Sequence, residues 1–451
     1  MAETSWFSFL SLYSPIACVL SVHSTAQHSD QIRDNAMDAF AYRGDDLLVE
    51  DLPLGRVAEQ YGTPLYVYSR AALRGQYKAL AQAMAAVKPL ICYSVKANSN
   101  GAVLKTFVAE GAGLDIVSGG ELFRGLRAGA PPGKIVFAGV GKTRAEIEYA
   151  LKQGILFFTV ESEPEAGRIG ACAKALGVKA RIAFRVNPDV DPETHKYIST
   201  GKKENKFGLD LLRVSDAYRA AAGLPGIEIA GLHLHIGSQI LSAQPFADAL
   251  DKVAPLCAEL KSAYASFRYL DIGGGIGIRY KPDQNPLSPA AYAEKVIPRL
   301  QATGLSIVLE PGRFLVGNAG VLVCRVQYVK RNVQKAFVIV DAGMNDLIRP
   351  SLYEAFHEVR AVTRREGNLH GDLVGPICES GDFLALDRDL PAVREGDLLA
   401  VMSAGAYGFS MSSQYNSRPR AAEIMVDGDR AMVVRRRETW DDLVAAETLP
   451  A

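Results

Sequence analysis

The sequence predicts a closed (β/α)8 barrel of the TIM type, joined to a β-rich domain. From Leu90 onward, eight short β-branched or aromatic runs alternate with amphipathic helical stretches over about 220 residues. After about Gly317 the alternation stops, and strand-like runs follow one another with only turns between them. Most of the eight runs end in polar or glycine residues, at the position where barrel enzymes carry their active sites. A doubly wound open sheet would alternate in the same way and is the structural alternative.

The eight strands expected for the barrel are Leu90–Ala97, Leu114–Ser118, Ile135–Gly139, Phe157–Glu161, Arg181–Asn187, Ile227–Gly237, Tyr269–Gly273 and Leu305–Glu310. Helices are expected between them, among others at Arg144–Gln153, Ser162–Leu176, Pro245–Lys261 and Pro289–Gln301. Ser162 is suited to cap the second of these helices, with Pro164 and Glu165 in the first turn.

The second domain is expected to be discontinuous in the chain. Its strands are predicted at Val321–Lys330, Ala336–Asp341, Asp397–Met402 and Ala431–Arg435. The strand-like segment Leu47–Tyr68 precedes the first barrel helix, and we expect it to join the same domain. The predicted division is therefore a β-rich domain from residues 37–68 and 318–445, and a barrel from residues 69–317.

The first 36 residues differ in character from the rest. No Asp, Glu, Lys or Arg occurs between Glu3 and Asp30, and Trp6–Val22 is mostly apolar but interrupted by serines and Pro15. A secretory signal is one interpretation, but an acid stands where a basic n-region is expected. The apolar stretch is also short for a spanning helix, which needs about 20 residues. We expect residues 1–36 to be a disordered or non-native extension, with Met37 the more natural start.

Composition excludes several classes of protein. The 451 residues are 48% hydrophobic and 22% charged, which is ordinary for a globular protein. Fifty basic residues balance fifty acidic ones, so no overall positive charge favours nucleic acid or an anionic membrane as a partner. The six cysteines form no C-x-x-C pair, which argues against a zinc ribbon and favours a reducing compartment.

The first and sixth strands end in residues that suggest chemistry. Lys96 follows an apolar strand, where a lysine is costly unless it is paired or reactive. A desolvated amine with a lowered pKa would form a Schiff base, and a salt-bridged lysine is the equal alternative.

His233 and His235 share one face of the sixth strand. A metal-dependent hydrolase would need further ligands, and only His357 and His370 follow, so we expect no metal. Stacking on a planar cofactor is favoured, with a core histidine the alternative for His233 in particular.

The seventh and eighth strands add a glycine run and two charges. The run Gly273–Gly277 follows Asp271 and would let backbone N–H groups approach an anion, with a plain tight turn as the alternative. After strand seven of a barrel such a run indicates a phosphate site. Strand eight ends in Glu310, Pro311, Gly312 and Arg313. A carboxylate facing a pyridine nitrogen would keep it protonated, and an ordinary Glu–Arg ion pair is the alternative.

Three polar clusters stand out in the β-rich part. Arg349 and Tyr353 are four residues apart, Cys378 and Glu379 are adjacent in a turn-rich stretch, and Tyr407 lies between small residues. Taken singly, each cluster is more typical of structure than of catalysis, and a buried free cysteine is usually inert.

Together these motifs resemble one family closely. A lysine, a stacking histidine, a glycine run and a pyridinium carboxylate, in this order on a barrel followed by a β domain, resemble the fold-type III pyridoxal-phosphate decarboxylases, whose fold is similar to that of alanine racemase. Within that group the sequence is similar to the diaminopimelate decarboxylases. The similar segments span about Leu47–Leu443 and include Gly62–Ser69, Tyr93–Asn98, Leu114–Leu122, His195–Gly208, Gly231–Ile240, Glu310–Arg313, Gly375–Asp382 and the Tyr407 loop. Asn205 stands where serine is usual, and residues 1–35 have no counterpart.

The resemblance implies a role for each candidate residue. Lys96 would bind pyridoxal 5'-phosphate covalently, His235 would stack on its ring, and Glu310 would hold the ring proton. The phosphate would be held by Ser238, the glycine run around Gly275, and the turn formed by Pro311, Gly312 and Arg313. The substrate residues would be Arg313, Arg349, Tyr353, Glu379 and Tyr407, with Tyr407 also near the cofactor, and Cys378 would return a proton to the α-carbon.

The resemblance also implies the reaction and the assembly. The expected reaction converts meso-2,6-diaminopimelate to L-lysine and CO2, the last step of lysine biosynthesis, in the cytoplasm. Arginines suit the distal carboxylate of this substrate, and Glu379 its ammonium. Cys378 and Glu379 would enter the partner subunit's site, so a homodimer is expected. The alternatives are a decarboxylase of arginine, ornithine or carboxynorspermidine, an amino-acid racemase, which the Glu310 carboxylate disfavours, and a non-catalytic homologue, which the presence of Lys96 and Cys378 disfavours.

Overall fold

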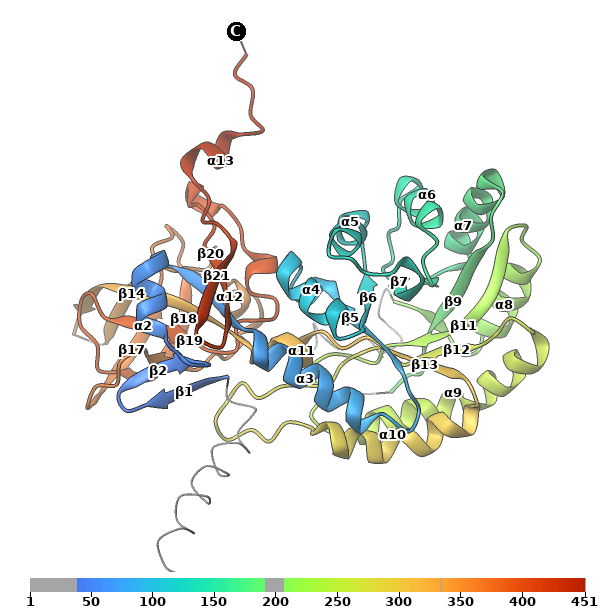
Figure 1. Ribbon diagram of the computed structural model, residues 1–451, viewed down its shortest axis with the longest axis horizontal. Coiled ribbons are helices and arrows are strands. Elements are labelled where there is room, and N and C mark those ends of the chain that lie inside the picture. The colour runs from blue at the N-terminus through green and yellow to red at the C-terminus, as the bar shows by residue number, and fades with distance from the viewer. Residues whose placement is uncertain (1–38, 191–206, 334, 451) are drawn as a thin grey trace, which may run out of the picture. The chain divides into compact units, whose positions relative to one another are not determined.

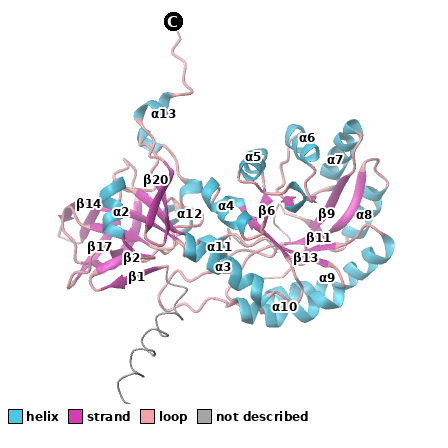
Figure 2. Ribbon diagram, viewed as in Figure 1, coloured by secondary structure: helices cyan, strands magenta, loops and turns pink. Residues whose placement is uncertain are grey.

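The computed structural model describes residues 39–190, 207–333 and 335–450, and within them it contains a closed barrel of eight parallel strands. Figure 2 shows the helices that follow these strands around the outside of the barrel. Each strand pairs in parallel with the next, and β8 pairs with β9 to close the ring. The strands are β5 (Leu90–Ser94), β6 (Gly113–Ile116), β7 (Ile135–Phe137), β8 (Phe157–Val160), β9 (Ala180–Asn187), β11 (Ile227–Leu234), β12 (Tyr269–Asp271) and β13 (Ser306–Leu309). The predicted barrel is therefore confirmed, and the open sheet is excluded.

The barrel helices follow the sequence pattern closely. Ser162 caps α7 as predicted, because its hydroxyl accepts the backbone N–H of Glu165. Ser69, Ser118, Thr143 and Ser288 cap four other helices in the same way. The helices are α3 (Arg70–Ala83), α4 (Gly101–Ala109), α5 (Gly119–Arg127), α6 (Arg144–Gln153), α7 (Glu163–Leu176), α8 (Val214–Ala222), α9 (Gln244–Ala263) and α10 (Pro289–Thr303), with short α11 (Arg313–Val316) after β13 and the two-residue strand β10 (Leu209–Asp210) beside β9.

A second sheet forms the β-rich domain, and it draws on both ends of the chain (Figure 1). Strand β4 (Leu65–Ser69) lies between β14 (Gly320–Arg331) and β20 (Ala422–Asp427), antiparallel to the first and parallel to the second. The domain is thus discontinuous, as the sequence predicts. Its other elements are β15 (Ala336–Val340), β16 (Val359–Ala361), β17 (Asn368–Val374), β18 (Phe383–Pro391), β19 (Leu398–Val401), β21 (Arg430–Arg435), α12 (Arg349–Tyr353) and α13 (Trp440–Val444).

The segment Leu47–Tyr68 is less uniform than predicted. It contains β2 (Asp46–Val49), which pairs with β1 (Phe40–Arg43) and with β3 (Leu52–Pro53), and then helix α2 (Leu54–Tyr61). The expectation of a strand throughout is wrong, because Leu54, Val57 and Ala58 recur at helical spacing and bury one face.

The expected extension 1–36 and most of the His195–Gly208 motif lie outside the described residues. No helix in the described part of the chain has the length and apolar character that crossing a membrane needs.

Candidate active site

Lys96 lies directly after β5, in the short 3-10 turn η1 (Val95–Ala97), with its side chain 39% exposed at the barrel mouth. Its Nζ atom lies 2.8 Å from Oδ2 of Asp115, which lies in the neighbouring strand β6 and has a fully buried side chain. Burial opposes the charge of the amine, but Asp115, Tyr407 and Glu310 together raise the pKa of Lys96 above its ordinary value. Without the cofactor, Lys96 is therefore salt-bridged, which is the second of the two alternatives that the sequence left open.

His235 lies just beyond β11 and keeps a neutral ring. Burial, together with the positive charges of Arg185 and Lys96, lowers the pKa of His235 well below its ordinary value. Its Nδ1 atom accepts the backbone N–H of Gly274 at 3.2 Å, which leaves the proton on Nε2. A neutral ring fixed by the glycine run is suited to stack on a planar cofactor.

Two glycines allow loops to meet at this end of the barrel. Gly275 has a φ of +113°, and a Cβ there would lie 2.6 Å from the carbonyl oxygen of Gly237. At Gly312 a Cβ would lie 3.0 Å from Cβ of Ser94, so the loop after β13 can approach the turn that carries Lys96. Pro311 joins the same contact, because its carbonyl accepts the N–H of Ser94 at 3.1 Å. The glycine run is thus a tight turn packed against the loop after β11, and the loop after β13 packs against the turn that carries Lys96.

Arg313 connects the predicted phosphate residues with the predicted substrate residues. Its Nη2 and Nε atoms donate to the Ser238 hydroxyl at 3.1 and 3.3 Å, and Nη1 donates to the Tyr280 hydroxyl at 2.6 Å. Glu310 bonds to His233 instead, so the ordinary Glu310–Arg313 ion pair is not found in the described part of the chain. Tyr280 is a site residue that the sequence analysis missed.

A pocket adjoins this arginine and has a volume of about 240 Å³. Its lining brings Arg313 together with Arg349 and Tyr353 of the β-rich domain, and it also includes Tyr280. The two guanidinium groups are both buried, and burial and the neighbouring Arg313 lower the pKa of Arg349. Burial alone would raise the pKa of Tyr280, but the two arginines lower it below the ordinary value. Two buried positive charges beside one pocket are suited to bind a carboxylate.

Tyr407 links the β-rich domain to the lysine. Its backbone N–H donates to the carbonyl of Ala97 at 2.8 Å, and its ring lies 4.9 Å from the Arg313 guanidinium carbon. The backbone of Tyr407 has a φ of +57°, which is uncommon for a residue other than glycine and is typical of constrained functional positions.

Cys378 and Glu379 are not part of this pocket. Both are exposed, in the turn between β17 and β18. The N–H of Cys378 donates to Oδ1 of Asn416 at 2.7 Å, and Oε2 of Glu379 lies 3.4 Å from the Tyr415 hydroxyl. Within one chain, the structure therefore does not bring these two residues to the pocket that holds Arg313 and Arg349.

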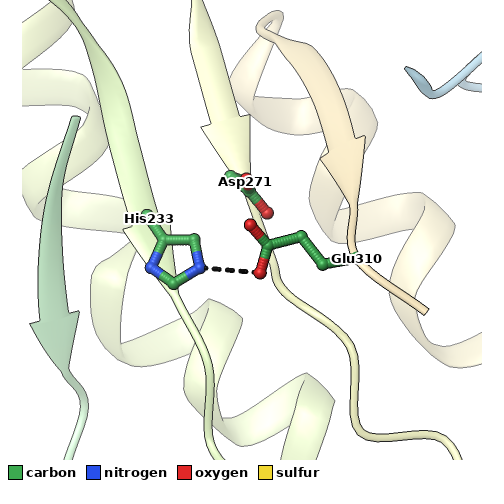
Figure 3. Close-up of side chains that lie close together, drawn as sticks. All are labelled: His233, Asp271 and Glu310. Carbon is green, nitrogen blue, oxygen red and sulfur yellow. Dashed lines mark hydrogen bonds and ion pairs between the residues drawn. The ribbon is translucent and has the colours of Figure 1, made fainter. Parts of the chain in front are cut away.

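Glu310 ends β13 inside the barrel, beside His233 and Asp271 (Figure 3). Its Oε2 atom lies 3.1 Å from Nε2 of His233, whereas Oε1 is buried without a hydrogen-bond partner in the described residues. One ligand atom from each of the three side chains lies within 4.8 Å of the others, a spacing that a metal ion could also use. At the later strand ends the neighbours of His233 are carboxylates, Asp271 and Glu310, rather than further histidines.

The residues present fit pyridoxal phosphate. Glu310 offers a buried acceptor atom, Oε1, that lacks a partner. Lys96 offers a partly exposed amine beside the close-packed glycine loops, and Ser238 with Arg313 offers hydroxyl and guanidinium donors for a phosphate. A ring acceptor, an amine and a set of phosphate donors at one barrel mouth are the groups that this cofactor requires.

Comparison with known proteins gives the family. The family model described as "Pyridoxal-dependent decarboxylase, pyridoxal binding domain" matches residues 70–317. A diaminopimelate decarboxylase of Pseudomonas aeruginosa is 53% identical over 414 residues, which cover 92% of this chain and 99% of that protein. The chain belongs to the diaminopimelate decarboxylase family. Its cofactor is pyridoxal 5'-phosphate.

Solved structures support this membership. The diaminopimelate decarboxylase of Helicobacter pylori complexed with L-lysine has a TM-score of 0.84 and 43% identity, covering 87% of this chain and 99% of that one. The enzyme of M. jannaschii in complex with L-lysine has a TM-score of 0.88 and 35% identity, covering 92% and 99%. A lysine/ornithine decarboxylase of Vibrio vulnificus complexed with putrescine is 23% identical with a TM-score of 0.74, which indicates a shared fold alone.

Proposed function

We propose that this chain decarboxylates meso-2,6-diaminopimelate to L-lysine and CO2, the last step of lysine biosynthesis. The observation that carries the proposal is the buried pair Arg313 and Arg349 beside one pocket at the barrel mouth. L-Lysine, the product, keeps the distal carboxylate of the substrate, and the enzymes of H. pylori and M. jannaschii are described in complex with L-lysine. Two arginines suit that carboxylate, which a diamine-forming decarboxylase would not need to bind.

Each side chain has a distinct task in the proposed reaction. When bound, pyridoxal phosphate supplies an electron sink for the electrons left when CO2 departs. Lys96 would hold the cofactor covalently through its Nζ amine. Glu310 would hold a proton on the ring nitrogen, and the neutral ring of His235 would pack against the cofactor. Ser238, Gly275 and the turn Pro311–Arg313 hold the phosphate.

The substrate end is assigned in the same way. Arg313 and Arg349 bind the distal carboxylate, while Tyr353 and Tyr407 pack beside the guanidinium groups. Glu379 binds the distal ammonium, and Cys378 donates a proton to the α-carbon. Because Cys378 and Glu379 are exposed and outside their own pocket, they are assigned to the site of the partner subunit in a homodimer.

Two further proposals concern organisation and location. The division into residues 37–68 with 318–445 and residues 69–317 is supported by the pairing of β4 with β14, and by the match of the pyridoxal-binding model to residues 70–317. A cytoplasmic location is supported by the five free cysteines of the described residues, four of them buried.

The test is turnover by the purified protein with pyridoxal phosphate. Equal release of L-lysine and CO2 from meso-diaminopimelate is expected, with no turnover of arginine, ornithine or carboxynorspermidine. Borohydride reduction followed by peptide mapping should find the cofactor on Lys96. Turnover of a diamine precursor without turnover of the diacid, or a label on another lysine, would overturn the proposal.

A further inference from the structure

The carboxyl groups of Asp271 and Glu310 meet inside the barrel, at the ends of the adjacent strands β12 and β13. Asp271 is 0% exposed and Glu310 is 5% exposed, and Figure 3 shows their carboxyl groups turned toward each other. An oxygen of each lies within 4.8 Å of the other and of a His233 nitrogen. Two buried carboxylates this close cannot both carry a charge without a large cost.

One oxygen of each carboxyl group already has a partner. Oδ1 of Asp271 accepts the backbone N–H of Gly273 at 2.9 Å, and Oε2 of Glu310 faces Nε2 of His233 at 3.1 Å. The other two oxygens, Oδ2 of Asp271 and Oε1 of Glu310, are buried with no hydrogen-bond partner in the described residues. A single proton between the two groups would satisfy both atoms at once.

The surroundings decide which residue keeps the proton. Glu310 is close to His233 and Lys96, which lower the pKa of Glu310 although burial opposes its charge. Burial and the neighbouring Glu310 raise the pKa of Asp271 well above its ordinary value. The remaining groups that face Asp271 are the carboxyl group of Asp115, the thiol of Cys92 and the phenol of Tyr292. None of these three supplies a positive charge. The Gly273 N–H favours the ionised form of Asp271, but burial and the neighbouring Glu310 outweigh it.

We propose that Asp271 is a positioning residue that keeps the shared proton and donates a hydrogen bond from Oδ2 to Oε1 of Glu310. Held by Asp271 on one oxygen and His233 on the other, the Glu310 carboxylate is fixed in the orientation in which it faces the ring nitrogen of the cofactor. An ionised carboxylate has about four lone-pair sites, so two donors leave room for the ring N–H. The inference rests on the proposed function for the task of Glu310, and on this geometry for the task of Asp271.

Two substitutions at the same position separate the possibilities. Asp271→Asn keeps the shape of a protonated aspartic acid: its oxygen can accept the Gly273 N–H and its amide can donate to Glu310. We expect the visible spectrum of the bound cofactor and its dissociation constant to change less than about threefold, because the donor is kept. Asp271→Ala removes the donor, and we expect the cofactor to bind roughly tenfold to a hundredfold more weakly.

A matched control comes from the β-rich domain. Asp372 is also buried, but it pairs with Lys335 at 2.6 Å, away from the barrel mouth. Asp372→Asn should leave the spectrum and the cofactor dissociation constant unchanged. If Asp271→Ala does not fold, Asp271→Asn still tests the proposal. Should Asp271→Asn bind the cofactor as weakly as Glu310→Ala does, the proposal would be overturned.

The proton itself is tested in the apoprotein, without turnover. The infrared carbonyl band of a protonated carboxyl group should be lost at neutral pH in Asp271→Asn and kept in Asp372→Asn. An unchanged band, or a metal ion that is present in the wild type and missing from Asp271→Asn, would overturn the proposal. Failure of the wild type to release lysine would instead refute the proposed function, while the infrared result would still report on the shared proton.

Discussion

The Nζ atom of Lys96 and the Oδ2 atom of Asp115 lie 2.8 Å apart, across the ends of the adjacent strands β5 and β6. The carboxylate also accepts the hydroxyl of Ser94 at 2.6 Å, so it is held in place from two sides. This ion pair keeps the lysine charged, whereas attack on an aldehyde requires the neutral amine. The reactivity of Lys96 in the apoprotein is therefore set by Asp115.

Asp115→Asn should shift the pH dependence of cofactor capture. Because the Asp115 carboxylate raises the pKa of Lys96, its removal lowers that pKa and increases the neutral fraction of the amine at a given pH. The pH of half-maximal capture of pyridoxal phosphate by the apoprotein should fall by about one unit or more. Stopped-flow absorbance from about pH 6 to about pH 10 measures it. Asp251→Asn, which removes an exposed partner of Arg299, is the control, and an equal shift there would contradict the explanation.

Arg349→Met should weaken every ligand that carries the distal carboxylate. Loss of a buried, charge-assisted hydrogen bond should raise KM for meso-diaminopimelate by roughly tenfold to a hundredfold. Inhibition by L-lysine, which keeps this carboxylate, should weaken in parallel. Inhibition by 1,5-diaminopentane, which has no carboxylate, should stay nearly constant. Steady-state kinetics measures all three, and a uniform loss for all ligands would mean that Arg349 only supports the fold.

Tyr280→Phe should change how KM for the substrate depends on pH in the alkaline range. Arg313 and Arg349 lower the pKa of Tyr280, so its phenol ionises at a lower pH than an ordinary tyrosine. The phenolate then pairs with the guanidinium groups and competes with the substrate carboxylate, so affinity falls as pH rises. In the phenylalanine variant this alkaline rise in KM should disappear, with KM raised about threefold to tenfold near neutral pH because Arg313 loses a hydrogen bond of 2.6 Å. The pH profile of KM measures this effect. If KM still rises at alkaline pH in the phenylalanine variant, another group is responsible for the titration.

Mixing two inactive variants should restore activity if the site is shared between subunits. Lys96→Ala and Cys378→Ala disable different halves of the proposed composite site. Equal mixing with subunit exchange makes half of the dimers mixed, each with one intact site, so about a quarter of wild-type activity should return. Activity measured before and after exchange tests this. No recovery despite demonstrated exchange would place Cys378 in the site of its own chain.

Much of this arrangement could be predicted because barrel chemistry lies at strand ends. Lys96, His235 and Glu310 each follow a strand recognisable from its apolar run, and barrel closure then brings them to one mouth. Arg349 and Tyr407 come from the other domain, and periodicity contains no information on where they dock; their assignment relied on the resemblance.

The errors have physical causes as well. Asp115 was missed as the partner of Lys96 because pairing across strands depends on register, which fixes Ser94 opposite Asp115 only once the barrel has formed. Asp271 received no role from the sequence, because only the folded barrel turns its side chain inward toward Glu310. Helix α2 was read as strand because its eight residues are too few for a clear period.

The position of β4 has a consequence for biosynthesis on the ribosome. This strand is made before the barrel, yet it lies between β14 and β20, so its parallel neighbour emerges more than 350 residues later; the hydrogen bond from Tyr68 to Glu423 spans 355 positions. The barrel can close while translation continues, whereas β4 keeps an unpaired edge until almost the whole polypeptide has left the exit tunnel. Tyr407, which borders Lys96, also emerges late. Nascent chains should therefore acquire the vitamin B6 coenzyme only after release, and truncation before residue 422 should leave a barrel prone to aggregate.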